Sequence, residues 1–153
     1  MVVVNPAEMQ HAEAIAGLME ELDRHYGATE FDPIENRVEQ IRDALFGPVP
    51  AGAALLAWDD DQLVGLAAYS YLWPAAGVTR SMFLKELYVA QTHRRQGVGR
   101  LLMENLLTVA TKHGCSRVEW TTDQESLGAQ RFYAELGVPV RRDKLFYRSE
   151  LGE

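Results

Sequence analysis

Arg94-Arg95-Gln96-Gly97-Val98-Gly99 is the stretch that decides the fold of this chain, because it joins an apolar run at 83–89 to an amphipathic helix. The face of that helix carries apolar residues at helical spacing: Val98, Leu101, Leu102, Leu106, Val109 and Ala110. The first N–H groups of a helix have no partner within it, and the helix dipole attracts anions there. The two glycines let an anion approach the backbone, and the two arginines can add charge-assisted hydrogen bonds. The pattern predicts a phosphate-binding loop.

The six residues alone are equally consistent with a solvated turn. No Gly-Lys-Ser/Thr follows, so this is not a Walker loop. The third glycine and the acidic ribose partner of a dinucleotide fingerprint are also missing. The phosphates therefore belong to a different ligand.

The order of motifs resembles the GNAT superfamily of acetyl-CoA-dependent N-acyltransferases. In that family the phosphate loop reads Arg/Gln-x-x-Gly-x-Gly/Ala after a strand, as residues 94–99 do here. A later helix of the family carries a Phe-Tyr pair followed by Leu-Gly, matching Phe132-Tyr133-Ala134-Glu135-Leu136-Gly137. The resemblance runs from about Leu63 to Tyr147, and segments 83–99 and 120–137 look closest to the diamine and polyamine acetyltransferase branch.

The composition indicates one domain over residues 1–153, with 47% apolar residues for a core. The single cysteine, Cys115, excludes an internal disulfide and fits a reducing cytoplasm. No apolar run is long enough for a membrane span, so no membrane association is expected. The N-terminus indicates a first strand rather than a signal peptide. We expect no metal, because His113 and Cys115 alone do not make a metal site.

The net charge of −7 bears on the choice of partner. It disfavours nucleic acid, whose phosphates need a basic surface. It would favour a cationic substrate through long-range attraction, although solubility alone would explain it equally well.

The periodicity predicts an α+β fold. Helices are expected at 8–25, from Asp32-Pro33 to Leu45, at 97–113 and at 126–136, where Asp32 would cap the second helix and Pro33 would open it. Strands are expected at 53–58, 63–73 and 80–90, with a buried strand at 117–122 and a closing strand or strand pair at 138–140 and 144–149. The sheet is then mostly antiparallel, with one parallel crossover through the helix at 97–113. The resemblance implies that its two central strands splay apart and hold the pantetheine arm of acetyl-CoA between them.

The resemblance also implies the cofactor contacts. The backbone of Leu87, Tyr88 and Val89 would pair with pantetheine amides, and a main-chain N–H there would polarise the thioester carbonyl. These three residues are equally suited to be ordinary core-strand residues. The pyrophosphate would lie on a loop and helix start made of Arg94, Arg95, Gln96, Gly97, Val98, Gly99 and Arg100. Ser126 stands where the polyamine branch usually has a cofactor-contacting asparagine, and it could instead only cap the helix at 126–136.

Transfer of an acetyl group from a thioester to an amine needs a neutral amine and a proton for the leaving thiolate. Tyr133 is the family-implied general acid, with packing beside Phe132 as the alternative. The general base is assigned to Glu86, the nearest carboxylate, although the polyamine branch has glutamate where this chain has Lys85. Neighbours on a strand point to opposite faces, so Glu86 requires a local rearrangement or lies on the far side. A water chain could also take the proton.

The acceptor pocket is expected to combine aromatic and acidic side chains, which can hold an alkylammonium group. The aromatic candidates are Tyr26, Phe31, Tyr71 and Trp73. The acidic candidates are Glu20, Glu21, Asp23 and Glu30, for which a solvated helix face is the more common role.

These observations predict an enzyme, an acetyl-CoA-dependent N-acetyltransferase that modifies a primary amine of a small molecule by direct transfer. A diamine or polyamine is the acceptor that the branch implies. An aminoglycoside-like or amino-acid-derived acceptor, a protein lysine, or a non-catalytic acyl-CoA-binding module remain open. A homodimer is expected, as is common in this branch.

Overall fold

The computed structural model describes residues 1–152, which divide into two compact units, Met1–Thr121 and a second unit that begins at Thr122. The first unit holds the sheet and the phosphate loop. The second unit holds α4 (Leu127–Glu135), which carries Tyr133. The expectation that residues 1–153 form a single domain stays a prediction.

The first unit is built on a five-stranded sheet in the order β1-β2-β3-β4-β5. Neighbouring strands are antiparallel from β1 to β4, and β4 and β5 are parallel. The strands are β1 (Val2–Pro6), β2 (Ala53–Asp59), β3 (Gln62–Leu72), β4 (Arg80–Val89) and β5 (Cys115–Glu119). This confirms the predicted α+β class with its single parallel crossover.

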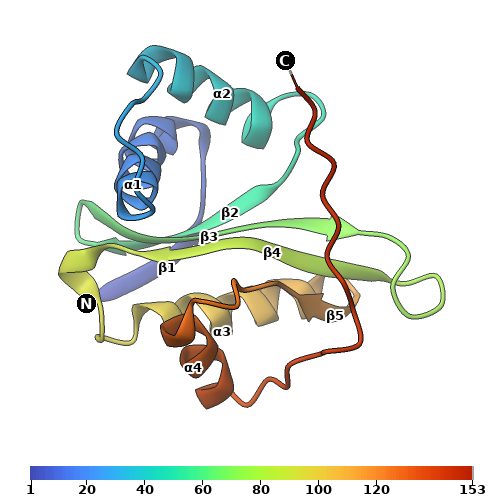
Figure 1. Ribbon diagram of the computed structural model, residues 1–153. Helices are drawn as coiled ribbons and strands as arrows, with labels where there is room; N and C mark the ends of the chain where they lie inside the picture. Colours follow the sequence, from blue (N-terminus) through green and yellow to red (C-terminus); the bar gives the residue numbers. More distant parts are fainter. Residues whose placement is uncertain (153) are drawn as a thin grey trace. The chain divides into compact units, whose positions relative to one another are not determined.

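Helices cover both faces of this sheet (Figure 1). Two of them, α1 (Ala12–His25) and α2 (Ile34–Phe46), lie on one face, and α3 (Val98–Lys112) lies on the other. Short 3₁₀ turns occupy Met9–His11 and Gln91–His93. The largest fully buried side chains come from the central strands and α3: Leu56, Val64, Leu66, Met82, Leu102 and Leu106. A methyl group at Gly65 would lie 3.0 Å from a Leu102 carbon and 3.1 Å from a Val98 carbon, so glycine there permits close helix–sheet packing.

The two central strands separate along their length. The parallel pairing of β4 with β5 runs only from Arg80↔Cys115 to Phe83↔Glu119, whereas β4 stays paired with β3 as far as Val89. Within residues 1–152, no strand pairs with the 84–89 edge of β4 on the β5 side. The sheet therefore has the expected splay and exposes backbone donors and acceptors along one edge.

A β-bulge at Lys85 changes which residues of β4 share a face. Leu84 pairs with Tyr69 and Glu86 pairs with Ala68, so two consecutive residues of β3 face three residues of β4. Directly opposed residues share a face of the sheet, and successive residues alternate. Glu86 therefore lies on the other face of the sheet from Leu84, although the two residues are an even number of positions apart. Glu86 shares its face with Tyr88, toward α1, by ordinary alternation.

Three local expectations were wrong. The structure assigns no strand to 138–140 or 144–149, where Leu145 and Tyr147 are 80% and 83% exposed; a strand needs a pairing partner, and the described residues give these segments none. The strand expected at 117–122 is β5, which is mostly exposed because it is the edge of the sheet. The second helix begins at Ile34, with Pro33 at the N-cap position and no side-chain cap, so Asp32 does not cap it.

Candidate active site

The predicted phosphate loop joins β4 to α3, as its sequence indicates. Two of its residues, one of them not a glycine, have a left-handed backbone conformation. Gly97 is the N-cap of α3 with φ of 82°, and Arg95 also has a positive φ, 61°. A left-handed conformation costs a non-glycine residue roughly 1–2 kcal/mol, and such residues concentrate at functional sites. No side chain among residues 1–152 caps Gly97, and the first turn of α3 carries no acidic residue. This helix start therefore suits an anion.

Arg94 is held in place before this helix start. Its Nε–H donates to the carbonyl of Val89 at 3.1 Å, and its guanidinium carbon lies 5.3 Å from the centre of the Tyr88 ring. The guanidinium has five N–H donors, and the bond to Val89 uses one of them. The side chain can thus keep its orientation and still bind an anion bidentately.

A second contact fixes the turn between β4 and the loop. His93 lies 2.8 Å from the carboxylate of Asp59 through Nε2, and its Nδ1 lies 2.8 Å from the Thr92 hydroxyl. The hydrogen bond from His93 lowers the pKa of the Asp59 carboxyl. Asp59 ends β2, so this contact ties the start of the loop to the β2–β3 hairpin.

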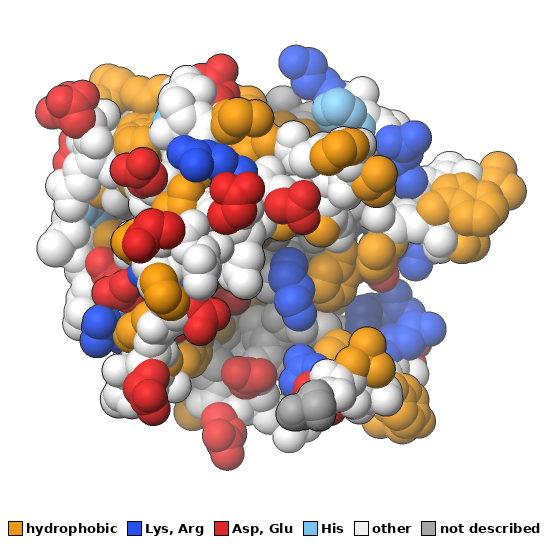
Figure 2. Space-filling view, turned by 90° about the horizontal axis from the view of Figure 1, so that it is seen from above, with side chains coloured by type: hydrophobic (Ala, Val, Ile, Leu, Met, Phe, Trp, Pro, Cys, Tyr) orange, Lys and Arg blue, Asp and Glu red, His pale blue; other side chains and the backbone are white. Residues whose placement is uncertain are grey.

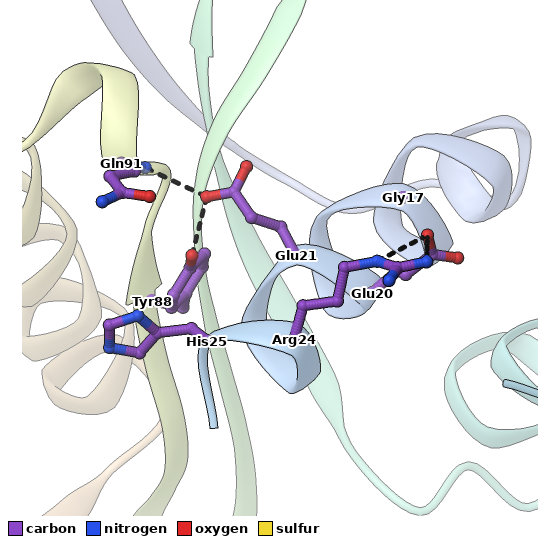
Figure 3. Close-up of a pocket in the computed structure, with 7 residues that line it drawn as sticks. All are labelled: Gly17, Glu20, Glu21, Arg24, His25, Tyr88 and Gln91. Atoms are coloured by element: carbon purple, nitrogen blue, oxygen red, sulfur yellow. Dashed lines mark hydrogen bonds and ion pairs between the residues drawn. The ribbon is translucent and has the colours of Figure 1, made fainter. Parts of the chain in front are cut away.

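A pocket of about 460 Å³ opens between α1 and the C-terminal end of β4 (Figure 3). The Glu21 carboxylate accepts hydrogen bonds there from the Tyr88 hydroxyl at 2.6 Å and from the Gln91 N–H at 3.0 Å. Burial and the bond to Glu21 raise the pKa of Tyr88 to about 12, so its hydroxyl stays a donor at neutral pH. The sequence pattern indicated a backbone role for Tyr88 and did not predict this use of its side chain. The one sequence signal was the position of Glu21, three residues after the buried Leu18 on the same helix.

Negative charge is concentrated on the α1–α2 side of the sheet. Residues 12–46 contain nine acidic and three basic residues, a net −6 with histidine neutral, compared with −7 for the whole chain. Figure 2 shows this face, where acidic side chains outnumber basic ones over the helices. Such a surface raises the local concentration of cationic ligands.

A model of the acetyltransferase (GNAT) family matches residues 15–138. The chain belongs to this family. The family uses acetyl-CoA, and the open β4 edge, leading into an uncapped helix start with two arginines, fits that co-substrate. No cluster of three or more His, Cys, Asp or Glu within residues 1–152 is arranged to hold a metal ion. In the same part of the chain, no helix combines the length and apolarity that a membrane span requires.

The chain is also similar to curated proteins named as N-acetyltransferases and to a solved structure. The type 1 aminoglycoside N(6')-acetyltransferase of Serratia marcescens is 37% identical over 70 residues, which are 46% of this chain and 48% of that protein. The L-ornithine N5-acetyltransferase NATA1 of Arabidopsis thaliana is 25% identical over 85 residues, 56% of this chain and 37% of that protein. The chain thus matches half or less of the length of these two relatives. An integron cassette protein from the mobile metagenome of V. cholerae superposes with a TM-score of 0.90 at 28% identity, covering 97% of this chain and 92% of that one.

Within the GNAT fold, the expected aromatic acceptor residues do not gather at one place. Tyr26 follows α1 and contacts the His25 ring, and Phe31 lies 4.5 Å below the Arg24 guanidinium. Tyr71 lies on the α3 face, against the ring of His113. Trp73 lies beyond β3, where its indole N–H donates to the Val78 carbonyl at 2.9 Å. Tyr71 is opposite Met82, six residues before Tyr88, which places it roughly 20 Å away along β4.

Ser126 and Tyr133 belong to the second unit. Ser126 precedes α4 as its N-cap residue but makes no side-chain capping bond. Tyr133 packs edge-on to Phe132, with ring centres 5.1 Å apart. Their roles toward the co-substrate stay predictions.

Proposed function

We propose that this chain is an acetyl-CoA-dependent N-acetyltransferase that modifies a primary amine of a small cationic molecule by direct transfer. The observation that carries the proposal is the open 84–89 edge of β4 leading directly into the uncapped start of α3. An extended amide chain can pair with such an edge, while its phosphates lie on the helix start. Family membership supports the same reaction.

Residues of this chain would bind acetyl-CoA and supply the proton for the leaving thiolate. Acetyl-CoA supplies the acetyl thioester when bound. Main-chain groups of Leu87, Tyr88 and Val89 would bind the pantetheine amides and orient the reacting carbonyl, and residues 94–100 would bind the pyrophosphate, with Ser126 as a further contact. Tyr133 would protonate the departing sulfur, so that the thiol leaves neutral.

Glu86 is the proposed general base. An alkylammonium has a pKa near ~10.4 and must lose its proton before it can attack a carbonyl. The face on which Glu86 lies supports this role: Glu86 alternates with Leu87 and so shares a face with Tyr88, toward the negatively charged α1–α2 side from which a cation would approach, while the bulge at Lys85 leaves Leu84 on the other face. The bulge is one form that the local rearrangement required for this role could take.

The acceptor class we propose is a small molecule with two or more amines, such as a diamine or polyamine. The net −6 of residues 12–46 supports a cation. Tyr26 and Phe31, next to α1, are the aromatic candidates on that side, and Tyr71 and Trp73 would serve a longer acceptor. An aminoglycoside or an amino-acid-derived amine also carries positively charged amino groups. Such acceptors are the second candidate, because two relatives are named as acetyltransferases of an aminoglycoside and of ornithine. The cytoplasmic location stays a prediction.

A thiol-release assay with purified protein and acetyl-CoA tests the function. The panel comprises a diamine, a triamine, ornithine, an aminoglycoside and a lysine peptide, each with its fully N-acetylated form as the matched control. We expect release with the multiply charged small amines and background rates with the controls. CoA binding without release for any amine would identify a non-catalytic binder, and release with the peptide alone would point to a protein lysine acetyltransferase.

We propose that the protein is a homodimer. The apolar side chains near the C-terminus support this, because Leu145, Phe146 and Tyr147 are 65–83% exposed in the described chain, and exposed apolar groups gain free energy when a partner covers them. Light scattering at micromolar concentration is expected to give twice the mass of one chain, and Phe146→Asp should shift the mass toward one chain. A wild-type protein with the mass of a single chain contradicts the dimer.

A further inference from the structure

Glu21 joins three parts of the fold that are far apart in sequence. It lies on α1, 67 residues before Tyr88 and 70 residues before Gln91, yet one of its carboxylate oxygens, Oε2, accepts hydrogen bonds from both (Figure 3). Tyr88 is near the end of β4, and Gln91 opens the turn that leads to the phosphate loop. One carboxylate thus ties α1 to the strand end and to the start of the loop.

The Tyr88 ring in turn supports Arg94. Tyr88 is 6% exposed, and the Arg94 guanidinium lies over the face of its ring. Cations are attracted to the face of an aromatic ring, and a fixed ring gives the guanidinium a fixed platform. The bond from Arg94 to the Val89 carbonyl fixes the inner part of the same side chain. The Glu21 carboxylate therefore contacts the hydroxyl of the same ring on which the outer part of Arg94 lies.

The neighbouring Glu20 lines the same pocket and carries the same charge, but its carboxylate binds other partners than that of Glu21. It bonds to Arg24 at 3.1 Å and to Arg37 at 2.8 Å, which links α1 to α2. These bonds of Glu20 go to arginines of α1 and α2 and leave β4 and the turn after it untouched. The two adjacent carboxylates hold different parts of the fold, and of the two it is Glu21 that contacts β4 and the turn before the phosphate loop.

We propose that Glu21 is a positioning residue for co-substrate binding: through Tyr88 and Gln91 it holds Arg94 in the orientation that binds the pyrophosphate. The inference rests on the proposed function, since it assumes that Arg94 binds a CoA phosphate. Glu21 itself need not touch either substrate. Its removal should act on affinity for CoA through Arg94 rather than on the chemical step.

Calorimetry with CoA on four single variants and one double variant tests this positioning role. Glu21→Ala is expected to weaken CoA binding about fivefold, within the range of coupling between residues of one network. Glu20→Ala removes the same charge from the same pocket and should change CoA affinity less than twofold. Glu21→Gln keeps an acceptor oxygen for both donors and should restore most of the affinity. In an Arg94→Ala background, Glu21→Ala should have less than a twofold effect, because the residue through which it acts is gone.

The other possible outcomes distinguish a failure of the positioning role from a failure of the proposed function. Equal CoA affinity of Glu21→Ala and Glu20→Ala, with a tight-binding wild type, overturns the positioning role and leaves the proposed function intact. An undiminished effect of Glu21→Ala in the Arg94→Ala background also overturns it, because the loss would then reflect a general change in structure. A wild type that does not bind CoA overturns the proposed function, and this inference with it.

If Glu21→Ala does not fold, Tyr88→Phe removes the hydrogen bond between Tyr88 and Glu21 and should weaken CoA binding by more than twofold. Steady-state kinetics should show the change in KM for acetyl-CoA, with kcat nearly unaltered.

Discussion

Tyr133→Phe is expected to lower turnover about 10²-fold, the low end for a lost general acid, while the fold and the affinity for CoA stay unchanged. The proton moves to sulfur only in the transition state, so the loss should appear in the rate constant rather than in binding. A tyrosine that only packs against Phe132 would behave differently, because the substitution removes a single hydroxyl and keeps the ring contact.

Steady-state kinetics on the purified variant separates the two roles of Tyr133. Tyr147→Phe is the matched control, because it removes a hydroxyl from a tyrosine of the same unit that is 83% exposed, and it should leave turnover unchanged. A turnover of Tyr133→Phe within about twofold of wild type, with chemistry shown to be rate-limiting, would end its assignment as the acid.

Gly99→Val is expected to weaken CoA binding at least about tenfold, which corresponds to roughly 1.4 kcal/mol. Gly99 is the second residue of α3, in the turn whose N–H groups we propose to bind the pyrophosphate. A branched side chain there would keep the anion away from the backbone. Valine is a better helix former than glycine, so the loss of affinity should not come with a loss of helix.

Calorimetry with CoA, together with circular dichroism, measures both parts of this expectation. Thr108→Val is the matched control, because it places the same side chain on the exposed side of the same helix. An unchanged CoA affinity for a folded Gly99→Val protein would falsify the assignment of the pyrophosphate to this loop. An equal loss in both variants would attribute the effect to α3 as a whole.

Local sequence signals predicted most elements of the first unit. Helix α1 was expected at 8–25 and occupies 12–25 after a 3₁₀ turn, and α3 was expected at 97–113 and occupies 98–112. These predictions were close because an amphipathic period and a glycine at each end of α3 act within a few residues. The phosphate loop was found for the same reason: a strand, two arginines, two glycines and a helix start are contiguous in the chain.

Local sequence signals did not predict which residues of β4 share a face with Glu86. Whether Glu86 shares a face with Leu84 or lies on the other face depends on the bulge at Lys85, and a bulge is defined only by the residues opposite it on β3. The bonds of Glu21 join residues 67 and 70 positions apart, a separation at which no periodic pattern in the sequence carries information. The strand expected at 144–149 was wrong for a related reason: alternating side chains show that a segment could form a strand, but a strand forms only when another strand pairs with it.

The sequence by itself determined the family and the class of fold, and it placed the proposed phosphate loop before the start of α3, because each depends on residues that are neighbours along the chain. Only the tertiary structure decided where β4 parts from β5, which face carries Glu86, and that Glu21 holds Tyr88 beneath Arg94. These features depend on which strand or helix lies opposite a given residue. Pairing and packing set that choice, since they bring backbone groups and side chains from distant segments within hydrogen-bonding distance.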